Sequence, residues 1–323
     1  MIARRQLLAG MAATGATLAA PWVRAQGNYP DQPIRWVVPY PAGGGTDLVA
    51  RLVTPRLAER WKQTVVIDNK GGASGILGSD IVAKSPPDGY TLLVMTSAHT
   101  INPYTTKQLP YDTERDFTPI TVLVKGALTL VGSPTGGFDS MDKFLAAARA
   151  NPGKYHFGST ENTTRMVGEL FRVKSGLKIE NVAYKGAAPM MQELLGGHIP
   201  VGFTSPLTAM SHHRNGTLRM LAVTSEKRLE VLPDVPTMAE AGVQGVDRPA
   251  WFALLGPGNM PPELAKRIQA DVAAVLAEPE TLAKIRDLAS EPGGESPDAF
   301  AQRVKEELVV WRDTAKAAGI EPE

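Results

Sequence analysis

Short apolar runs alternate with longer stretches that carry apolar residues at helical spacing along most of the chain. The former are typical of buried strands and the latter of amphipathic helices. Strands are expected at Ile34–Val38, Val65–Ile67, Tyr90–Met95, Val122–Val131, Tyr155–Gly158, Asn181–Tyr184, Val201–Phe203, Leu218–Val223 and Trp251–Leu255. Helices are expected at Leu48–Glu59, Ile76–Lys84, Val167–Lys174, Met190–Leu195, Leu207–Arg214, Pro262–Ala277, Glu280–Ala289 and Pro297–Ala318. This alternation predicts an α/β protein with mostly parallel sheets covered by helices on both faces.

The alternation falls into two blocks, and the chain crosses between them twice. It leaves the first block near residue 124 and returns to it between residues 225 and 250. Residues 26–124 and 225–323 are therefore expected to form one discontinuous domain, and residues 125–224 a second one. With 323 residues, 43% of them hydrophobic, the chain is long enough to bury two cores. The two crossings predict a hinge beside a cleft.

The first 25 residues have the composition of an export signal. Arg4 and Arg5 precede an apolar run from Leu7 to Ala20, and a small-x-small cleavage motif ends at Ala25. A membrane anchor is the alternative, but the run is too short to span a bilayer comfortably and Pro21 follows it. The chain is therefore expected in the periplasm, and the arginine pair fits either a Sec or a twin-arginine route.

Composition and charge argue against several classes of function. The chain has no cysteine, which excludes disulfides and thiolate chemistry, and its net charge of +1 lacks the basic field of a nucleic-acid-binding protein. No G-x-S-x-G motif occurs, and the histidines have no carboxylates at metal-site spacing. We therefore expect a monomer with no catalytic residues, no metal and no cofactor. Of the histidines, His99 lies in a predicted cleft loop.

The segment Pro39–Asp47, with the sequence PYPAGGGTD, lies between a predicted strand and a predicted helix. Glycines let the backbone approach a ligand closely, Thr46 or Asp47 can cap the helix, and free N–H groups at a helix start favour an anion. The alternative is a tight turn, although three successive glycines exceed what such a turn requires. Pro55 lies inside the expected helix, which should therefore kink or begin later.

Loops after the other strands supply further candidates, because ligands bind at the carboxyl ends of parallel strands. One such loop holds hydroxyl and amide side chains that suit a carboxylate, and one of them is expected to cap the following helix. This cluster consists of Ser159, Thr160, Asn162, Thr163 and Thr164. Two acids are nearby: Asp47 is expected either to cap its helix or to brace its own loop, and the orientation of Glu161 is open.

Short motifs in a fixed order extend over nearly the whole mature chain. They are Pro39–Asp47, Pro87–Leu93, Pro110–Asp112, Asp116–Phe117, Ala150–Lys154, Tyr184–Gly186, Leu194–Gly197, Leu221–Thr224 and Leu232–Thr237. In these motifs the sequence resembles the Bug family, the extracytoplasmic receptors of tripartite tricarboxylate transporters. The resemblance implies a two-domain Venus-flytrap fold, like that of type II periplasmic binding proteins, with a cleft between the domains.

The resemblance also implies a function and a set of ligand-binding residues. The ligand is expected to be a small organic carboxylate, either a di- or tricarboxylate or an aromatic acid, which is delivered to two membrane subunits or presented to a sensor protein. A secreted α/β hydrolase is the rival class, but we find no nucleophile and base for it. The implied ligand-binding residues are Tyr40, Ala42, Gly43, Gly44, Thr46, Asp47, Thr96, Ser97 and Ala98 in the first domain and Ser159, Thr160, Thr163, Lys185, Gly186, Ala187 and Thr204 in the second.

Two stretches of the second domain depart from the pattern of that family. Residues 159–165 stand where relatives usually have a longer glycine-containing loop, often with a histidine, and residues 199–205 lack the aspartates that are common there. Lys185 and the hydroxyls of Ser159, Thr163 and Thr204 favour an anionic or neutral polar group of the ligand. The second domain is therefore where ligand contacts should differ most from those of relatives.

The export signal predicts where the mature chain begins. Cleavage after Ala25 should leave a mature chain that begins at Gln26, because the residues before this bond fit the peptidase rule. N-terminal sequencing of protein from the periplasmic fraction checks the site. A membrane-bound product that keeps Met1 would contradict it.

Overall fold

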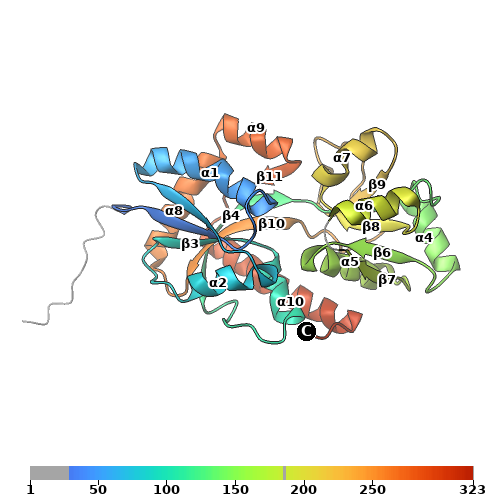
Figure 1. Ribbon diagram of the computed structural model, residues 1–323, viewed down its shortest axis with the longest axis horizontal. Coiled ribbons are helices and arrows are strands. Elements are labelled where there is room, and N and C mark those ends of the chain that lie inside the picture. The colour runs from blue at the N-terminus through green and yellow to red at the C-terminus, as the bar shows by residue number, and fades with distance from the viewer. Residues whose placement is uncertain (1–28, 185–186, 323) are drawn as a thin grey trace, which may run out of the picture. The chain divides into compact units, whose positions relative to one another are not determined.

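The computed structural model describes residues 29–184 and 187–322, and its strands form two sheets (Figure 1). The six-stranded first sheet has the order β11–β4–β10–β3–β1–β2, and the five-stranded second sheet has the order β7–β6–β8–β5–β9. The first sheet consists of β1 (Ile34–Val38), β2 (Val65–Asn69), β3 (Thr91–Thr96), β4 (Phe117–Gly126), β10 (Ala250–Pro257) and β11 (Ser290–Pro292). The second sheet consists of β5 (Thr129–Gly132), β6 (His156–Ser159), β7 (Glu180–Ala183), β8 (Val201–Thr204) and β9 (Arg219–Val223). The expected α/β class is confirmed.

Both sheets are mixed, so the expectation of mostly parallel sheets was wrong. In the first sheet β1 is parallel to β2 and β3, whereas β10 is antiparallel to β3 and β4, and β11 is antiparallel to β4. In the second sheet β6 is parallel to β7 and β8, whereas β5 is antiparallel to β8 and β9. The antiparallel pairs involve strands at the crossings, where the chain enters or leaves a sheet without the crossover helix that parallel neighbours require.

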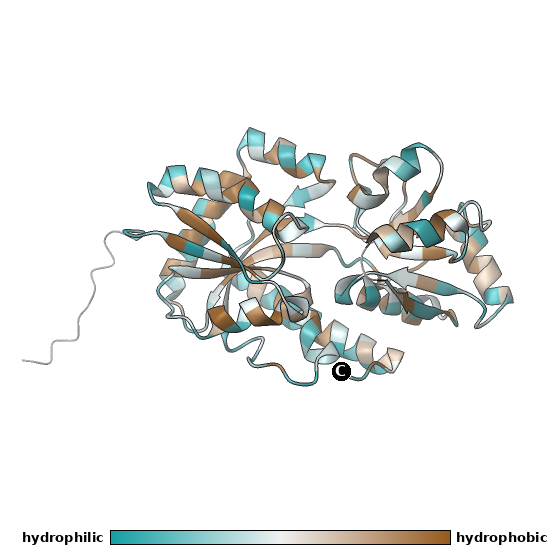
Figure 2. Ribbon diagram, in the orientation of Figure 1, coloured by the Kyte–Doolittle hydropathy of each residue, from teal (hydrophilic) through white to brown (hydrophobic). Residues whose placement is uncertain are grey.

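Helices follow most of the strands. They are α1 (Gly45–Trp61), the short 3₁₀ helix η1 (Ala73–Gly75), α2 (Ile76–Ala83), α3 (Ala98–Thr105), α4 (Met141–Ala150), α5 (Asn162–Ser175), α6 (Ala187–Gly196), α7 (Pro206–Arg214), α8 (Pro262–Leu276), α9 (Pro279–Asp287) and α10 (Pro297–Ala318). Every helix that the sequence predicted is present, and α3 and α4 are additional. Figure 2 shows apolar residues along the strands and mixed colours on the helices, as expected when each helix buries one face.

Helix α1 begins before Leu48 rather than later, contrary to one of the two expectations, and it includes Pro55. It starts at Gly45 and continues through Pro55 to Trp61. Proline has no backbone N–H, so the carbonyl four residues before Pro55 lacks its helical partner. Pro55 is exposed, so this carbonyl can bond to water. The buried side chains of Val53 and Leu57 hold the helix against the core on either side of the proline.

The chain crosses between the sheets at two places close to those predicted. The expected long strand Val122–Val131 is divided, since β4 ends at Gly126 in the first sheet and β5 begins at Thr129 in the second. The chain leaves the second sheet after Val223, the end of β9, and re-enters the first at Ala250. All strands before residue 127 and after residue 249 thus belong to one sheet, and those between them belong to the other.

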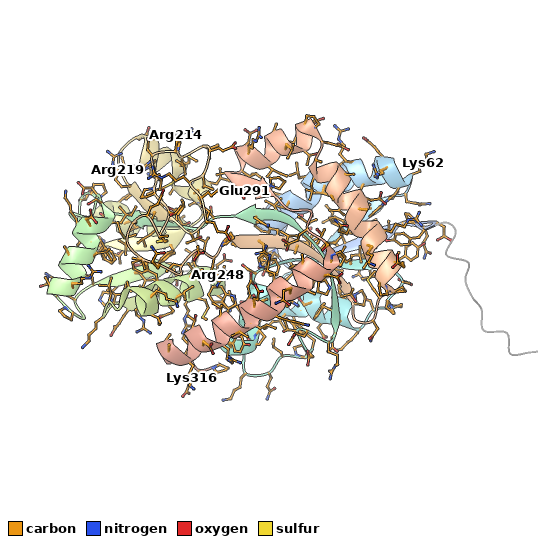
Figure 3. The ribbon with its side chains drawn as sticks, turned by 180° about the vertical axis from the view of Figure 1, so that it is seen from behind. Lys62, Arg214, Arg219, Arg248, Glu291 and Lys316 are labelled. Carbon is orange, nitrogen blue, oxygen red and sulfur yellow. The ribbon has the colours of Figure 1, made fainter. Side chains whose placement is uncertain are left out.

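The C-terminal helix α10 contributes to the cores of both sheets. Phe300, Val304 and Leu308 pack in the cluster that contains Trp251 and other residues of the first sheet. Trp311 and Ala315, one to two turns later, pack in the cluster that contains side chains of the second sheet, including Phe203. Figure 3 shows the opposite face of the molecule, with Lys316 in the last turn of α10 and Arg248 on the segment that precedes β10.

A buried acid, Glu307, connects α10 to the first sheet. Its carboxylate accepts hydrogen bonds from Trp251 Nε1 (2.8 Å) and Thr100 Oγ1 (2.8 Å), and the backbone carbonyl of Trp251 accepts one from the Ser97 N–H (3.1 Å). Burial raises the pKa of Glu307, because the interior disfavours its charged form. Glu307 thus connects α10 to Trp251 in β10 and to Thr100 in α3.

No helix within residues 29–184 and 187–322 has the length and apolar character needed to cross a membrane. The predicted signal segment, residues 1–25, lies outside the described residues.

Gly168 provides a test of packing in the second core. A methyl group at this position of α5 would overlap the ring of Phe157, which is completely buried. Replacing a helical glycine by alanine normally stabilises by about 1 kcal/mol, whereas overpacking costs about 1–3 kcal/mol. Gly168→Ala should therefore lower the free energy of unfolding in urea titrations. The exposed Lys174→Ala in the same helix should change it by less than about 0.5 kcal/mol. A more stable Gly168→Ala protein would contradict this packing.

Candidate functional site

A cavity of about 280 Å³ lies where several helices begin. Its lining includes Gly45 and Leu48 in the first turn of α1, Ala187 at the start of α6, and Pro206 and Leu207 at the start of α7. It also includes residues that flank the start of α5. The full lining consists of Gly45, Leu48, Val49, Val124, Gly126, Ala127, Leu128, Thr160, Glu161, Thr164, Ala187, Thr204, Ser205, Pro206, Leu207, Thr208, Ala250, Phe252, Leu288, Ala289 and Ser290.

The N-terminus of α1 has no side-chain cap. Gly44 is the N-cap residue, so the expected capping by Thr46 or Asp47 was wrong, and both of these side chains lie buried in the first turn. The backbone N–H groups of Gly45, Thr46 and Asp47 make no hydrogen bond to any residue that the structure describes. These are the donors that a helix N-terminus offers to an anion.

Asp47 braces the glycine-rich loop, which is one of the two roles expected for it. Its carboxylate accepts hydrogen bonds from the Gly43 N–H (2.8 Å), Arg51 Nε (2.8 Å) and Asn69 Nδ2 (3.1 Å). The Arg51 guanidinium, with these two further donors, lowers the pKa of Asp47 to about 2, even though burial opposes the shift. Asp47 is therefore ionised and paired with a cation, so its charge at the start of α1 is balanced.

Tyr40 and Thr96 lie together beneath this loop. The Tyr40 hydroxyl and Thr96 Oγ1 are 3.0 Å apart, and Thr96 Oγ1 also accepts a hydrogen bond from the Ala98 N–H (3.2 Å). Burial raises the pKa of Tyr40, so its hydroxyl stays protonated. The Ser97 hydroxyl is buried and has no partner among the described residues.

Several of the predicted site residues do not reach the cavity. Its lining lacks the first-domain residues Tyr40, Ala42, Gly43, Gly44, Thr46, Asp47, Thr96, Ser97 and Ala98. It also lacks Ser159 and Thr163, which are buried in the second sheet and in α5. Thr160, Ala187 and Thr204 do line it, whereas Lys185 and Gly186 lie outside the described residues.

The hydroxyl and amide cluster at the start of α5 mostly bonds within the protein. Asn162 Nδ2 donates to Ser74 Oγ in η1 (3.3 Å) and to Thr105 Oγ1 at the end of α3 (3.3 Å). Thr164 Oγ1 accepts hydrogen bonds from the N–H groups of Thr160 (2.9 Å) and Glu161 (3.1 Å). This part of the predicted carboxylate site is therefore used to cap α5 and to connect it to elements beside the first sheet.

The N-cap residue of α5 is Glu161, whereas a hydroxyl or amide residue was expected there. It forms a capping box with Thr164, in which its carboxylate is turned toward the backbone N–H of Thr164. The residue is exposed and lines the cavity, and partial desolvation by the surrounding protein raises the pKa of its carboxyl. No ion pair joins Glu161 to any lysine, arginine or histidine in the described part of the chain.

Thr204 presents a free hydroxyl to the cavity at the end of β8. The residue is only 3% exposed, and its hydroxyl makes no hydrogen bond to another described residue. The neighbouring Ser205 caps α7 by accepting a hydrogen bond from the Thr208 N–H (3.3 Å). The Thr204 hydroxyl is therefore available to a ligand.

The remaining lining is largely apolar, and the sequence did not point to it. Val124, Leu128 and Phe252 come from strands or the crossing beside them, and Leu207 and Leu288 come from helix ends. In the sequence these residues have the spacing of an ordinary core. No lysine, arginine or histidine occurs among the described residues of the lining.

Residues 49–320 match the family described as "Tripartite tricarboxylate transporter family receptor". The chain belongs to this receptor family. It is 32% identical over 316 residues to a protein encoded between tcbD and tcbE in Pseudomonas sp. (strain P51), covering 96% of this chain and 93% of that protein. It is also 32% identical over 308 residues to BugT of Bordetella pertussis, covering 94% of each.

Solved structures of the receptor family have the same fold. A protein of R. palustris solved with adipate is 34% identical, with a TM-score of 0.79 over 91% of this chain and all (100%) of that one. The periplasmic binding protein BugD is 30% identical, with a TM-score of 0.74 over 91% of this chain and 100% of its own. A malate-bound protein of Rhodopseudomonas palustris is 26% identical, with a TM-score of 0.73 over 89% of this chain and 100% of its own. The predicted Bug-family membership and periplasmic-binding-protein fold are confirmed.

His99 is not a cleft residue of this receptor, contrary to the sequence-based expectation. It lies in α3 with no exposed surface, its Nε2 is 3.1 Å from the Thr113 carbonyl oxygen, and its ring makes an edge contact with Phe117. Burial lowers its pKa to about 4, so the ring is neutral near pH 7. No cluster of three or more histidine, aspartate and glutamate side chains within the described residues could hold a metal ion.

The stability that Asp47 contributes to the fold should depend on pH, because it comes from the charged form of the carboxyl. A carboxyl whose pKa is lower in the folded than in the unfolded protein stabilises fully above its ordinary pKa of 3.8, and this stabilisation is lost as the pH falls to about 2. Asp47→Asn should therefore lower the free energy of unfolding by roughly 1–3 kcal/mol at pH 7. Urea titrations at several pH values should show the difference from wild type shrinking below pH 3.8. A difference that is constant with pH would contradict this role for the charge.

Proposed function

We propose that this receptor captures a small organic acid in the cavity and holds its carboxylate at the N-terminus of α1. The uncapped start of that helix, with Gly45 in the cavity lining, is the observation that carries the proposal. An anion there accepts hydrogen bonds from first-turn N–H groups and interacts favourably with the positive end of the helix dipole. Gly45 lets the carboxylate approach closely, because it has no side chain.

Two other features support carboxylate binding. The hydroxyl of Thr204 in the second sheet is a further donor, so contacts would come from both sheets. Structural relatives were solved with adipate and with malate, which are both carboxylates. Of the predicted site residues, Gly43, Gly44, Thr46 and Asp47 then act by shaping and bracing the loop before α1.

The family suggests the place of this binding step in transport. After export through the signal that ends at Ala25, the protein would bind its ligand in the periplasm and deliver it to the two membrane subunits of a tripartite tricarboxylate transporter. Binding alone is sufficient for this role. The cavity offers hydroxyls but no histidine among its described residues, which suits binding rather than hydrolysis.

A matched pair of variants on α6 tests whether the cavity is the binding site. Ala187 lines the cavity, whereas the next residue, Ala188, is exposed and does not. Ala187→Leu should weaken binding by more than about tenfold, or about 1.4 kcal/mol, because its added carbons occupy ligand space. Ala188→Leu should leave affinity unchanged.

The measurement is isothermal titration calorimetry with the acids that raise the melting temperature of the wild type in a screen of aliphatic and aromatic carboxylates. A cooperative unfolding transition, measured without ligand, shows whether each variant is folded. A screen with no stabilising carboxylate would refute carboxylate binding. Equal affinities of the two folded variants would instead place the site elsewhere.

A further inference from the structure

Residues at the N-termini of α1 and α5 both line the cavity, and the two helix starts differ in their caps. At α1 the N–H groups of Gly45, Thr46 and Asp47 have no partner in the described structure. At α5 the corresponding N–H groups are those of Asn162, Thr163 and Thr164, and the carboxylate of the N-cap residue Glu161 is turned toward the Thr164 N–H. A ligand carboxylate therefore finds an open helix start at α1, whereas a carboxylate of the protein already lies at the start of α5.

The two ends also differ in charge. Asp47 at α1 is paired with Arg51, with 2.8 Å between Oδ2 and Nε. Glu161 at α5 lines the cavity, and no described lysine, arginine or histidine pairs with it. Its carboxylate already occupies the position near the α5 N-terminus that an anionic ligand group would take. A second ligand carboxylate on this side would meet a like charge in a partly desolvated space.

Much of the remaining cavity wall is apolar. Val49, Val124, Leu128, Leu207 and Phe252 contribute to its walls. Apolar walls favour a ligand body of alkyl or aromatic carbon and offer no compensation for a second buried charge.

We propose that the cavity selects monocarboxylates with an apolar body, and that Glu161 is the specificity-determining residue that disfavours dicarboxylates. This proposal rests on the proposed function, since it takes the α1 N-terminus as the site of the single carboxylate. It distinguishes this chain from the R. palustris relative solved with adipate, a dicarboxylate.

Hexanoate and adipate test the proposal because they share a chain length and differ in the second carboxylate. Calorimetry at pH 7 and constant ionic strength should show that the wild type binds hexanoate at least about tenfold more tightly than adipate. Glu161→Gln removes the charge and keeps the shape, so adipate affinity should rise at least about tenfold while hexanoate affinity changes little. Glu180→Gln, an exposed acid at the start of β7 that does not line the cavity, should behave as wild type.

The outcomes separate the two proposals. Wild-type binding of adipate as tight as that of hexanoate, or an unchanged ratio in Glu161→Gln, would overturn the selectivity and leave carboxylate binding intact. Binding of neither acid, nor of any other carboxylate in the screen, would overturn both. If Glu161→Gln does not fold, Glu161→Ser is measured in its place, because serine caps a helix without a charge.

Discussion

The helix N-termini around the cavity are the constraint on which the site depends. In a βα unit the helix begins beside the carboxyl end of its strand, so units with parallel strands place their helix starts at one edge of the sheet. The units β1–α1 and β6–α5, from different sheets, therefore bring two positive helix ends to one cavity, and α6 and α7 add their own. Unpaired N–H groups at such ends must bond to side chains, water or a ligand. Capping chemistry then decides where a ligand charge is accepted.

Local sequence signals were sufficient to predict most helices and strands, but not which strands pair or in which direction. Helix α10 has its predicted bounds because Ser296 and Pro297 mark its start and Gly319, with φ of 67°, marks its end. Helix α4 carries comparable signals, a capping Ser140 and apolar residues at helical spacing, and could have been predicted. The antiparallel pairing of β10 with β3 and β4 could not have been predicted in this way. Strand β10 follows a long connection with no periodic pattern, and its pairing depends on contacts between strands that are distant in the sequence.

The sequence predicted the local bracing of the glycine-rich loop but not most of the residues that line the cavity. The glycine-rich segment before α1 indicated an anion site, and Asp47 was identified as its brace, because both follow from local chemistry. His99 was misplaced, since an eight-residue helix buries a position that looked like a loop. Phe252 and Leu128 resemble core residues in the sequence, and only the packing of the two sheets leaves their surface beside an open space. The sequence indicated that Glu161 is an acid near the cleft, but not that it caps α5.

Helix α10 adds a connection between the sheets that the two crossings alone did not suggest. Its first half packs in the first core through Phe300 and Val304, and its second half packs in the other core through Trp311 and Ala315. The hydrogen bonds of Asn162 to Ser74 and Thr105 make a further link near the cavity. Any movement of one sheet toward the other must therefore shift Trp311 and Ala315 within their core or bend α10 between Leu308 and Trp311. Close-packed cores resist such shifts, so the width of the cavity is set by the C-terminal helix as well as by the strands that cross beside it.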